Sequence, residues 1–202
     1  MDDQANCHDA AALVLAAGLS TRFGSGNKLL QDLAGQPVAA HVARMLIAFP
    51  FRRHLAVCTA GPVAGIYKAL GFEVIPNPTP EAGMGSSLQL GIDVAGPGGP
   101  VLICLADMPL VSANHIAALF HALPLSPSGV VATSAVDYRG PPAVLSPDVF
   151  NGKVFEGDQG ARALLKDALM VPTEWDQVTD IDNEAALDKA RQSARHFGAK
   201  QH

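Results

Sequence analysis

Short apolar runs, each bounded by glycine, proline or polar residues, recur along the chain. They are too short to be independent helices, and we interpret them as buried strands, although periodicity alone cannot separate a buried strand from a buried helix. The expected strands are Ala11–Ala16, His54–Cys58, Val74–Ile75, Val101–Leu105 and Val130–Thr133.

Helical patterns fall between several of these runs. Val38, Val42 and Phe49 recur at a spacing of three to four residues or its multiples, and Pro37 suits a first helical turn. Similar patterns predict helices at Val63–Leu70, Ser87–Val94, Ser112–His121, Ala161–Leu169 and Glu184–His196, with Ser112 and Asn183 as N-caps. The repetition of strand and helix predicts an α/β fold of three layers, with a mostly parallel, Rossmann-like sheet and ligands at the carboxyl ends of its strands.

Length and composition narrow the class of protein. A chain of 202 residues fits one compact domain, and we expect residues 1–9 and 198–202 to be flexible ends. Disorder is excluded because 49% of the residues are hydrophobic and only 16% are charged. A net charge of −5 with scattered basic residues argues against nucleic acid as a partner.

The chain also lacks the signals of export and of membrane insertion. No apolar run approaches the roughly 20 residues of a spanning helix, and the acidic start has no positive region like that of a signal peptide. Cys7, Cys58 and Cys104 are widely spaced, which argues against a disulfide framework or a zinc site. We therefore expect a cytoplasmic protein without a membrane partner.

The segment after the first expected strand has the composition of a phosphate-binding loop. Gly18, Gly24 and Gly26 permit close approach of the backbone to an anion. Arg22 can add a forked donor and Lys28 a compact positive charge. Neither the Walker motif nor the dinucleotide motif fits, because leucine follows Lys28 where each pattern needs another residue. Composition alone leaves open a glycine-rich surface loop with unrelated charges.

Residues 15–24 read Leu-Ala-Ala-Gly-x-Ser-x-Arg-x-Gly, and a lysine follows. This resembles the opening signature of the MobA-like nucleotidyltransferases, and above all the molybdenum cofactor cytidylyltransferases, which are MocA-like. The resemblance implies that the loop wraps a nucleoside triphosphate, with Arg22 and Lys28 as catalytic cations on its phosphates. It also implies nucleotide contacts from Leu15, Ala16, Ala17, Gly18 and Ser20.

A second segment, Asn77–Leu88, follows another expected strand. Its prolines forbid helix, and Ser86 or Ser87 can start the next helix. A helix start offers free amides to an anion or a base edge. Similar Gly-Met-x-x-Ser-Leu segments line the nucleotide site of the cytidylyltransferases, which implies contacts from Asn77, Gly83, Met84, Ser86 and Ser87. The alternative is a loop and an N-cap that need no ligand.

Carboxylates that follow buried segments are candidates for a metal site. Asp107 comes just after the run Val101–Leu105, and Mg²⁺ prefers hard oxygen ligands. It matches the family's Asp-x-Pro metal site. Asp180-Ile-Asp182 resembles the family's Asp-Ile-Asp-Thr-Pro-Glu-Asp segment, although Asn183 stands in place of the threonine. We prefer Asp182 as the second ligand, and Asp180 remains the alternative. For Asp107, the alternative is an ordinary turn aspartate.

Two further segments resemble the acceptor side of the family. Tyr138–Leu145 is expected to be a glycine-proline turn that enters a strand, like the Gly-x-Pro segment beside the acceptor pocket. Residues 157–162 resemble the Gly-Asp-x-Gly-Ala-Arg segment of the molybdenum cofactor enzymes. The implied acceptor-binding residues are Gly140, Pro142, Asp158, Gly160 and Arg162. Asp158 could instead cap a helix, and Arg162 could be a solvated charge.

The resemblance implies transfer of CMP from CTP, with Mg²⁺, to the phosphate of a molybdenum-pterin acceptor, with release of pyrophosphate. Ala17 favours CTP over GTP, because guanylyltransferases usually carry a second glycine there. Three alternatives stay open: a guanylyltransferase that uses GTP, a nucleotidyltransferase for a sugar phosphate or another small molecule, and a binding protein that delivers the cofactor to a molybdenum hydroxylase apo-enzyme. No histidine cluster or nucleophile motif supports hydrolase chemistry.

Overall fold

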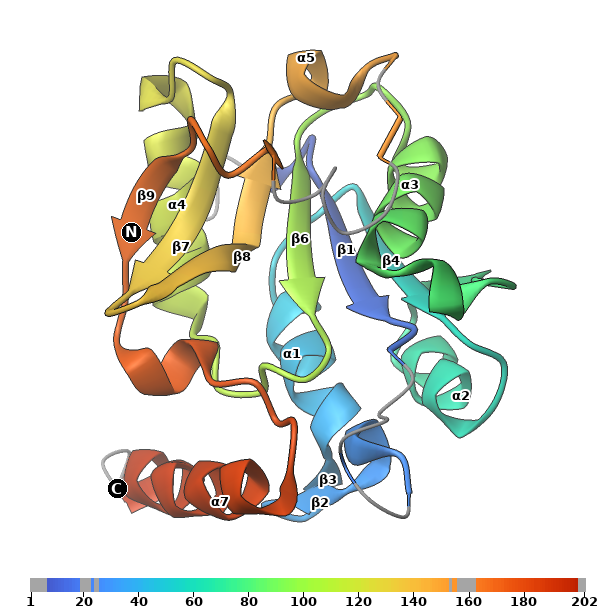
Figure 1. Cartoon of the computed structure of the whole chain (residues 1–202), viewed down its shortest axis with the longest axis vertical. Coiled ribbons are helices and arrows are strands. Elements are labelled where there is room, and N and C mark those ends of the chain that lie inside the picture. The colour runs from blue at the N-terminus through green and yellow to red at the C-terminus, as the bar shows by residue number, and fades with distance from the viewer. Residues whose placement is uncertain (1–6, 19–22, 24–25, 153, 156–162, 200–202) are drawn as a thin grey trace.

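The computed structural model describes residues 7–18, 23, 26–152, 154–155 and 163–199 of the chain, with side chains of the last helix described as far as Ala194. Within this part, seven strands form one sheet (Figure 1). Its order is β5 (Glu73–Pro76), β4 (Arg53–Cys58), β1 (Ala11–Ala16), β6 (Val101–Leu105), β8 (Tyr138–Leu145), β7 (Val130–Ala135) and β9 (Leu169–Pro172).

The sheet is mostly parallel, as predicted. β1 pairs in parallel with both β4 and β6, so that Leu13 lies opposite Leu55 on one side and Ile103 on the other. β4 with β5 and β7 with β9 are also parallel pairs. Only β8 runs in the opposite direction, antiparallel to its neighbours β6 and β7. All five predicted strands are present.

Alternate residues of the central strands face two separate cores. In β1, Ala12 and Val14 belong to one hydrophobic cluster, whereas Leu13 and Leu15 belong to the other. A strand buried on both faces reads as a continuous apolar run, which explains the sequence of β1. Helices α1 (Val38–Leu46), α2 (Pro62–Ala69) and α4 (Ala113–Ala122) cover the first face. Helices α3 (Met84–Ala95) and α5 (Pro147–Phe150) cover the second.

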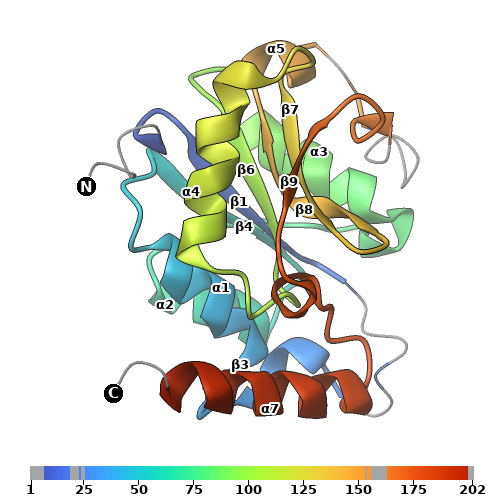
Figure 2. The same ribbon diagram turned by 90° about the vertical axis from the view of Figure 1, so that its left-hand side faces the viewer.

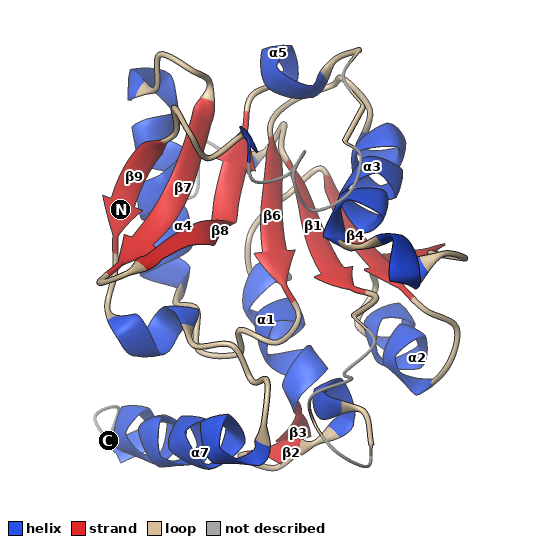
Figure 3. Ribbon diagram, viewed as in Figure 1, coloured by secondary structure: helices blue, strands red, loops and turns tan. Residues whose placement is uncertain are grey.

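Figure 2 shows α1, α2 and α4 on one side of the strands and α3 on the other, and Figure 3 shows the strands side by side in one sheet. The predicted arrangement of three layers is therefore confirmed. Helix α3 approaches β1 closely at Gly91, where an added Cβ atom would lie 2.4 Å from each Cδ atom of Leu13. The small residue sets the spacing of this layer.

The C-terminal helix α7 (Glu184–Ala199) lies beside a small hairpin of β2 (Asp32–Leu33) and β3 (Gln36–Pro37), at the bottom of Figure 1. Arg191 donates to the carbonyl oxygen of Asp32 from Nε at 3.2 Å and from Nη2 at 3.0 Å. Asn183 caps the helix as predicted, because its Oδ1 accepts from the amide of Ala186 at 2.9 Å. The start of α7 is thereby fixed near the carboxyl ends of the strands.

Short 3-10 helices complete the described chain: η2 (Lys28–Leu30), η3 (Pro80–Ala82), η4 (Leu123–Leu125) and η5 (Trp175–Val178). Ser112 caps α4 as predicted, accepting from the amide of His115 at 3.2 Å. Cys7, Cys58 and Cys104 are free and buried. No helix among the described residues is long and apolar enough to cross a membrane.

Two predicted helices need correction. The helix expected at Ala161–Leu169 extends too far, because in its described part Ala163 is helical but residues 164–167 form turns and Leu169 begins β9. Its apolar residues belong to a cavity wall and to an edge strand, where a terminal proline is tolerated. The helix expected from Ser87 begins earlier, at Met84.

Candidate active site

Two neighbouring parallel strands, β1 and β6, end side by side beneath the candidate site. The amide of Ala106 donates to the carbonyl oxygen of Leu15 at 3.1 Å, which continues their pairing to the end of the strands. The loop that follows β1 and the carboxylate of Asp107, just after β6, therefore emerge at the same edge of the sheet. Ligands of open α/β sheets bind at this edge.

Lys28 enters the site from η2, the short helix that follows the first loop. Asn27 holds the start of this helix, because its Oδ1 accepts from the amide of Leu29 at 2.9 Å. The Lys28 residue is only 8% exposed. Its Nζ lies 2.6 Å from Oδ2 of Asp107 and 2.7 Å from Oδ1 of Asp182. The structure thus brings together three residues that the sequence placed in separate motifs.

A backbone hydrogen bond holds the segment Asp180–Asp182 against Asp107. The amide of Ile181 donates to the carbonyl oxygen of Asp107 at 3.0 Å, and the Ile181 side chain is fully buried. Asp180 and Asp182 flank this anchored residue and therefore both lie near Asp107. Asp182 reaches Lys28, whereas Asp180 lines a cavity beside it.

The charges of this cluster compensate one another. Burial by itself lowers the pKa of Lys28, but the Asp107 carboxylate, followed by Asp182, outweighs burial and raises it. Burial, followed by the nearby charges of Asp107 and Asp182, raises the pKa of Asp180 to about 7, although Lys28 opposes this shift. Among the described residues, Oδ1 of Asp180 is a buried oxygen without a hydrogen-bond partner.

A cavity of about 430 Å³, here called the loop cavity, opens between the end of β1, Lys28 and the start of α3. It is lined by predicted nucleotide-binding residues of the first loop, namely Leu15, Ala16, Ala17 and Gly18. Lys28 and Asp107 line the same cavity. An added Cβ atom at Gly18 would meet nothing within 4 Å, so the backbone there borders open space. This space suits a ligand held by backbone groups.

The start of α3 forms another wall of the loop cavity, through Gly83, Met84 and Ser87. Gly83 occupies the N-cap position with a φ of 89°, and no side chain caps the helix there. The prediction that Ser86 or Ser87 starts this helix is wrong, because both lie inside its first turn. Amides at an uncapped helix start attract anions, so this wall offers a contact for phosphate or a base edge.

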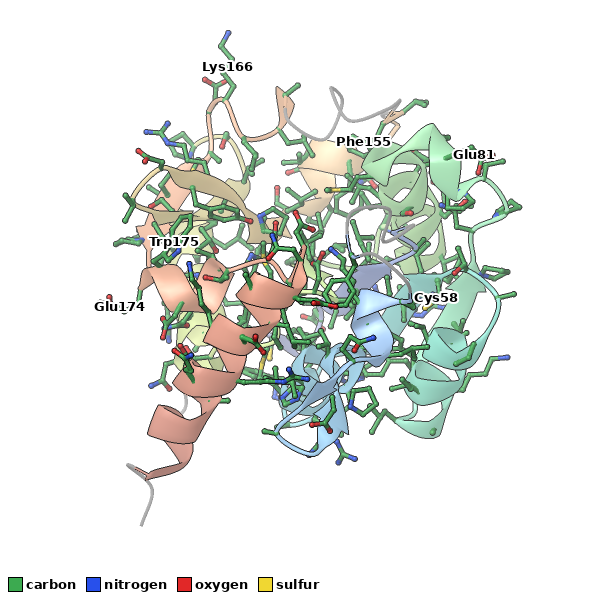
Figure 4. All side chains as sticks on the ribbon, turned by 60° about the horizontal axis from the view of Figure 1, so that its bottom comes forward. Cys58, Glu81, Phe155, Lys166, Glu174 and Trp175 are labelled. Carbon is green, nitrogen blue, oxygen red and sulfur yellow. The ribbon has the colours of Figure 1, made fainter. Side chains whose placement is uncertain are left out.

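Asn77 and Ser86, also predicted to bind nucleotide, are not among the residues that line the loop cavity. The buried side chain of Asn77 donates from Nδ2 to Oγ of Ser87 at 2.9 Å and to Oγ of Ser86 at 3.2 Å. Its Oδ1 accepts from the amide of Thr79 at 2.9 Å. Asn77 thus fastens the preceding loop to α3. Figure 4 shows Glu81 of this loop, which the sequence analysis had not selected, at the edge of the molecule.

A second cavity of about 260 Å³, here called the bulge cavity, adjoins the first. The two cavities share Leu15, Met84 and Leu105 in their walls. Asp180 and the β8 residues Tyr138 to Pro141 also line the bulge cavity. The predicted acceptor residue Gly140 is therefore at this cavity, whereas Pro142 is buried and is not among its lining residues.

An interruption in the pairing of β7 and β8 shapes the bulge cavity. Ala132 pairs with Ala143 and Thr133 with Gly140, so the two prolines between them stand outside the ladder. Their carbonyl oxygens are bound by side chains instead: Tyr138 donates its hydroxyl to Pro141 at 2.5 Å, and Thr133 donates to Pro142 at 2.6 Å. Bulges of this kind re-aim residues beside binding sites.

Several predicted residues lie outside the described part of the chain: Ser20, Arg22, Asp158, Gly160 and Arg162. Conversely, Tyr138 and Arg139 line the bulge cavity although they were not selected as site residues. Their position was a usable signal, because they directly precede the glycine-proline segment.

The donor set of the cluster suits a hard divalent cation. The Asp107 and Asp182 carboxylates both come within hydrogen-bond distance of one ammonium group, so their oxygens converge on a common position. Mg²⁺ typically takes one or two carboxylates together with phosphate oxygens and water. Within the described residues no group of three or more His, Cys, Asp or Glu side chains surrounds a metal position.

Comparison with known proteins identifies the family. The model of the MobA-like NTP transferase domain matches residues 12–174. The chain belongs to this family. Its members are nucleotidyltransferases that bind nucleoside triphosphates and acceptor substrates and generally depend on divalent metal.

Two curated relatives align with this chain over different shares of their own length. Purine catabolism protein PucB of Bacillus subtilis is 28% identical over 197 residues, which cover 89% of this chain and 94% of PucB. Bifunctional protein GlmU of Rhizorhabdus wittichii is 37% identical over 110 residues, which cover 52% of this chain. This match spans only 24% of GlmU.

Solved structures share the fold at low sequence identity. Rv0371c from Mycobacterium tuberculosis has a TM-score of 0.77 at 19% identity, covering 92% of this chain and 98% of that one. It has also been solved in complex with manganese. Molybdopterin-guanine dinucleotide biosynthesis protein A from Archaeoglobus fulgidus has a TM-score of 0.64 at 17% identity, covering 92% and 99%.

Proposed function

We propose that this nucleotidyltransferase moves CMP from CTP, with Mg²⁺, to the phosphate of a molybdenum-pterin acceptor and releases pyrophosphate. The observation that carries the proposal is the cluster of Lys28, Asp107 and Asp182 beside two adjoining cavities. One cavity can hold the nucleotide, the other can hold the acceptor, and the charged cluster lies where their phosphates would meet.

The loop cavity is our candidate for the nucleotide. Backbone groups from Leu15 to Gly18 border it, and the uncapped start of α3 faces it. Both features attract phosphate without a large excess of positive charge, in keeping with a chain of net charge −5. We assign Arg22 to the same phosphates from its place in the family signature.

Asp107 and Asp182 would hold the Mg²⁺ ion, which when bound supplies neutralisation of the phosphate charge. Lys28 can then leave the carboxylates and donate to the triphosphate, since it lines the loop cavity and has a long, flexible side chain. These residues orient the α-phosphate and stabilise charge that develops on the departing pyrophosphate.

The chemistry needs little covalent help from the protein. An oxygen of the acceptor phosphate forms a bond to the α-phosphorus, and the bond from that phosphorus to the bridging oxygen of pyrophosphate breaks. Because the loop and bulge cavities share walls, the two reactants can lie next to each other, and this positioning accounts for much of the expected rate.

The choice of CTP rests on Ala17, which lines the loop cavity. The pterin acceptor rests on the sequence resemblance, and it is consistent with a structural relative whose name includes molybdopterin-guanine dinucleotide biosynthesis. GTP is therefore the competing nucleotide. A cytoplasmic location and hand-over of the product to a molybdenum hydroxylase apo-enzyme belong to the same proposal.

Thermal unfolding with Mg²⁺ and each of CTP, GTP, ATP and UTP tests the nucleotide. A ligand at about 100 times its dissociation constant stabilises the fold by about 2.7 kcal/mol. We expect CTP to give the largest shift, and only when Mg²⁺ is present. A larger shift with GTP would instead make the chain a guanylyltransferase.

Pyrophosphate release with molybdenum-pterin as acceptor tests the reaction itself. We expect Asp107→Asn to lower the rate by about 100-fold or more. Asp148→Asn is the matched control, because Asp148 is an exposed aspartate on α5. Full Mg²⁺-dependent turnover in Asp107→Asn would contradict the assigned role. Acceptor binding without pyrophosphate release in the unmodified protein would favour a delivery protein.

A further inference from the structure

Each of the two cavities has a single cation among its described lining residues. Lys28 is the cation of the loop cavity, and Arg139 is the cation of the bulge cavity. The two differ in their partners. Asp107 and Asp182 bind Lys28, whereas the guanidinium group of Arg139 forms no ion pair or hydrogen bond with any residue that the structure describes. Its donors are therefore available to a ligand.

The register of β6 and β8 places Arg139 at the edge of the sheet where ligands bind. Ile103 lies opposite Ala143 in an antiparallel pair, so residues earlier in β8 lie beside residues later in β6. Arg139 is close to the start of β8 and thus lies beyond the end of β6 at Leu105. This is the edge at which Asp107 emerges.

The alternation of side chains along β8 directs Arg139 to the face of the sheet that α3 covers. Tyr138 packs against the hydrophobic cluster that includes Met108, on the opposite face. Because neighbouring residues of a strand point to opposite faces, Arg139 points toward α3. Met84 at the start of α3 lines both cavities. Arg139 therefore shares a face of the sheet with the wall that joins the two cavities.

The backbone is fixed on both sides of Arg139. Tyr138 donates its hydroxyl to the carbonyl oxygen of Pro141 at 2.5 Å, so its side chain crosses Gly140. An added Cβ atom at Gly140 would lie only 2.7 Å from that hydroxyl oxygen. Arg139 itself pairs with Ser134 of β7. The strand is thus held in place without any bond from the guanidinium group.

A guanidinium group presents its N–H donors in a planar fork that matches phosphate, so the two can form a pair of parallel hydrogen bonds. We propose that Arg139 binds the acceptor through the phosphate that attacks the nucleotide, and that the acceptor class is a phosphomonoester. The inference rests on the proposed function and adds to it the residue that binds the attacking group.

This assignment leaves the attacking atom free. Two oxygens of the phosphate accept from Arg139, and the third forms the bond to the α-phosphorus while the bond to the bridging oxygen of pyrophosphate breaks. A phosphomonoester dianion has no proton to lose in this step, so Arg139 has only to hold and orient it.

Two coumarin probes test the inference in the unmodified protein. 4-Methylumbelliferyl phosphate carries a phosphomonoester on a flat ring, and 7-methoxy-4-methylcoumarin carries an uncharged methoxy group at the same position. We expect the phosphate probe to bind at least about tenfold more tightly in calorimetric titrations at about pH 7.5, because the methoxy probe lacks the hydrogen bonds between charged groups. Equal binding of the two probes, or no binding of the phosphate probe, would overturn the inference.

Variants of the two cavity cations locate the phosphate. Arg139→Gln removes the charge and the fork, so the preference for the phosphate probe should fall to roughly onefold. Arg139→Lys keeps the charge without the fork and should retain part of the preference. Lys28→Met should retain all of it. Arg44→Gln is the matched control, because Arg44 is an exposed arginine of α1, on the other face of the sheet.

Transfer to the molybdenum-pterin acceptor supplies a second readout. Arg139→Gln should raise KM for the acceptor by at least about tenfold while KM for the nucleotide stays constant. The same variant should keep the Mg²⁺-dependent thermal shift with nucleotide.

The contrary outcomes are distinct. If Lys28→Met rather than Arg139→Gln removes the preference for phosphate, the probe binds in the loop cavity and the inference fails. If Arg139→Gln raises both KM values alike, Arg139 supports the fold or the nucleotide, and the inference also fails. A normal nucleotide shift alongside either result leaves the proposed nucleotidyl transfer intact. Failure of the unmodified protein to bind any nucleotide would count against the transfer itself.

Discussion

The ammonium nitrogen of Lys28 lies 2.6 Å from Oδ2 of Asp107, which joins the loop after β1 to the residue after β6. Asp182 reaches the same nitrogen at 2.7 Å. Two carboxylates thus share one buried cation in the position where the proposed function needs a metal ion. A metal and Lys28 must compete for the same oxygens, so metal binding and movement of Lys28 toward phosphate are linked.

Replacement of Lys28 by methionine tests this competition. Without divalent metal, Lys28→Met leaves the two carboxylates without their shared cation, and we expect a loss of about 1–3 kcal/mol in the free energy of unfolding. Mg²⁺ should then stabilise the variant more than it stabilises the unmodified protein, because no ammonium group has to be displaced. Thermal unfolding in chelator and in Mg²⁺ measures both effects.

Lys68→Met is the matched control for this experiment. Lys68 is an exposed residue of α2 away from the carboxylate cluster, and its loss should leave stability nearly unchanged in either solution. Equal responses of Lys28→Met and the unmodified protein to Mg²⁺ would mean that the metal binds elsewhere.

A buried chain of hydrogen bonds supports the bulge of β8. Nε2 of His115 lies 2.8 Å from Oγ1 of Thr133, which donates to the carbonyl oxygen of Pro142. Thr133→Val keeps the shape of the side chain but removes the hydroxyl, and leaves a buried donor and a buried acceptor unpaired. We expect a loss of about 1–3 kcal/mol in stability. Because the bulge lines the bulge cavity, KM for the acceptor should rise while KM for the nucleotide stays constant.

Steady-state rates with each substrate varied in turn, together with denaturant unfolding, measure these changes. Thr133→Ser retains the hydroxyl and should restore the acceptor KM. An equal rise in both KM values for Thr133→Val would indicate general loosening of the fold instead.

The sheet was predictable because its central strands are buried on both faces. β1 and β6 read as unbroken apolar runs, and neighbouring turn residues marked their ends. β9 escaped prediction because Leu169–Pro172 is a short edge strand whose apolar residues continue a helix-like spacing from the preceding turn. Only its pairing with β7, distant in the sequence, makes it a strand.

In the candidate site too, local sequence patterns were predictable, whereas contacts between distant segments were not. Asp107 and Lys28 were found from their position after strands and from the family signature, both of which are local properties. The sequence could not show that the Asn77 side chain donates a hydrogen bond to Ser87, because this bond depends on the path of the backbone between the two residues. Likewise, the different surroundings of Asp180 and Asp182 arise only because Ile181 is anchored on Asp107.

The hydrogen-bonded pair of His115 and Thr133 makes the stability of the fold depend on pH, because His115 can be protonated. Burial lowers the pKa of this histidine, so the folded protein binds its proton more weakly than the unfolded chain does. The contribution of neutral His115 is fully present above about pH 6.5, the unfolded value, and is lost as pH falls through the lower folded pKa. Denaturant unfolding should show that the free energy of unfolding falls less between about pH 8 and pH 5 for His115→Gln than for the unmodified protein.

His8→Gln provides the control for that series, because it replaces an exposed histidine outside the hydrogen bonds of His115 and Thr133. Parallel curves for His115→Gln and the unmodified protein would show that the loss at low pH comes from other groups.

Two glycines in helices provide opposite tests of packing. A Cβ atom at Gly91 of α3 would lie 2.4 Å from the Cδ atoms of Leu13, which is fully buried in β1 and has little room to move. We expect Gly91→Ala to cost about 1–3 kcal/mol through overpacking. At Gly65, an exposed residue inside α2, the added atom would meet nothing within 4 Å. Gly65→Ala should therefore stabilise the protein by about 0.5–1 kcal/mol through helix propensity. The midpoints of denaturant unfolding of the two variants test this contrast. If both substitutions stabilise the protein, α3 can move away from β1. The start of α3 would then be a less rigid wall of the loop cavity than its packing implies.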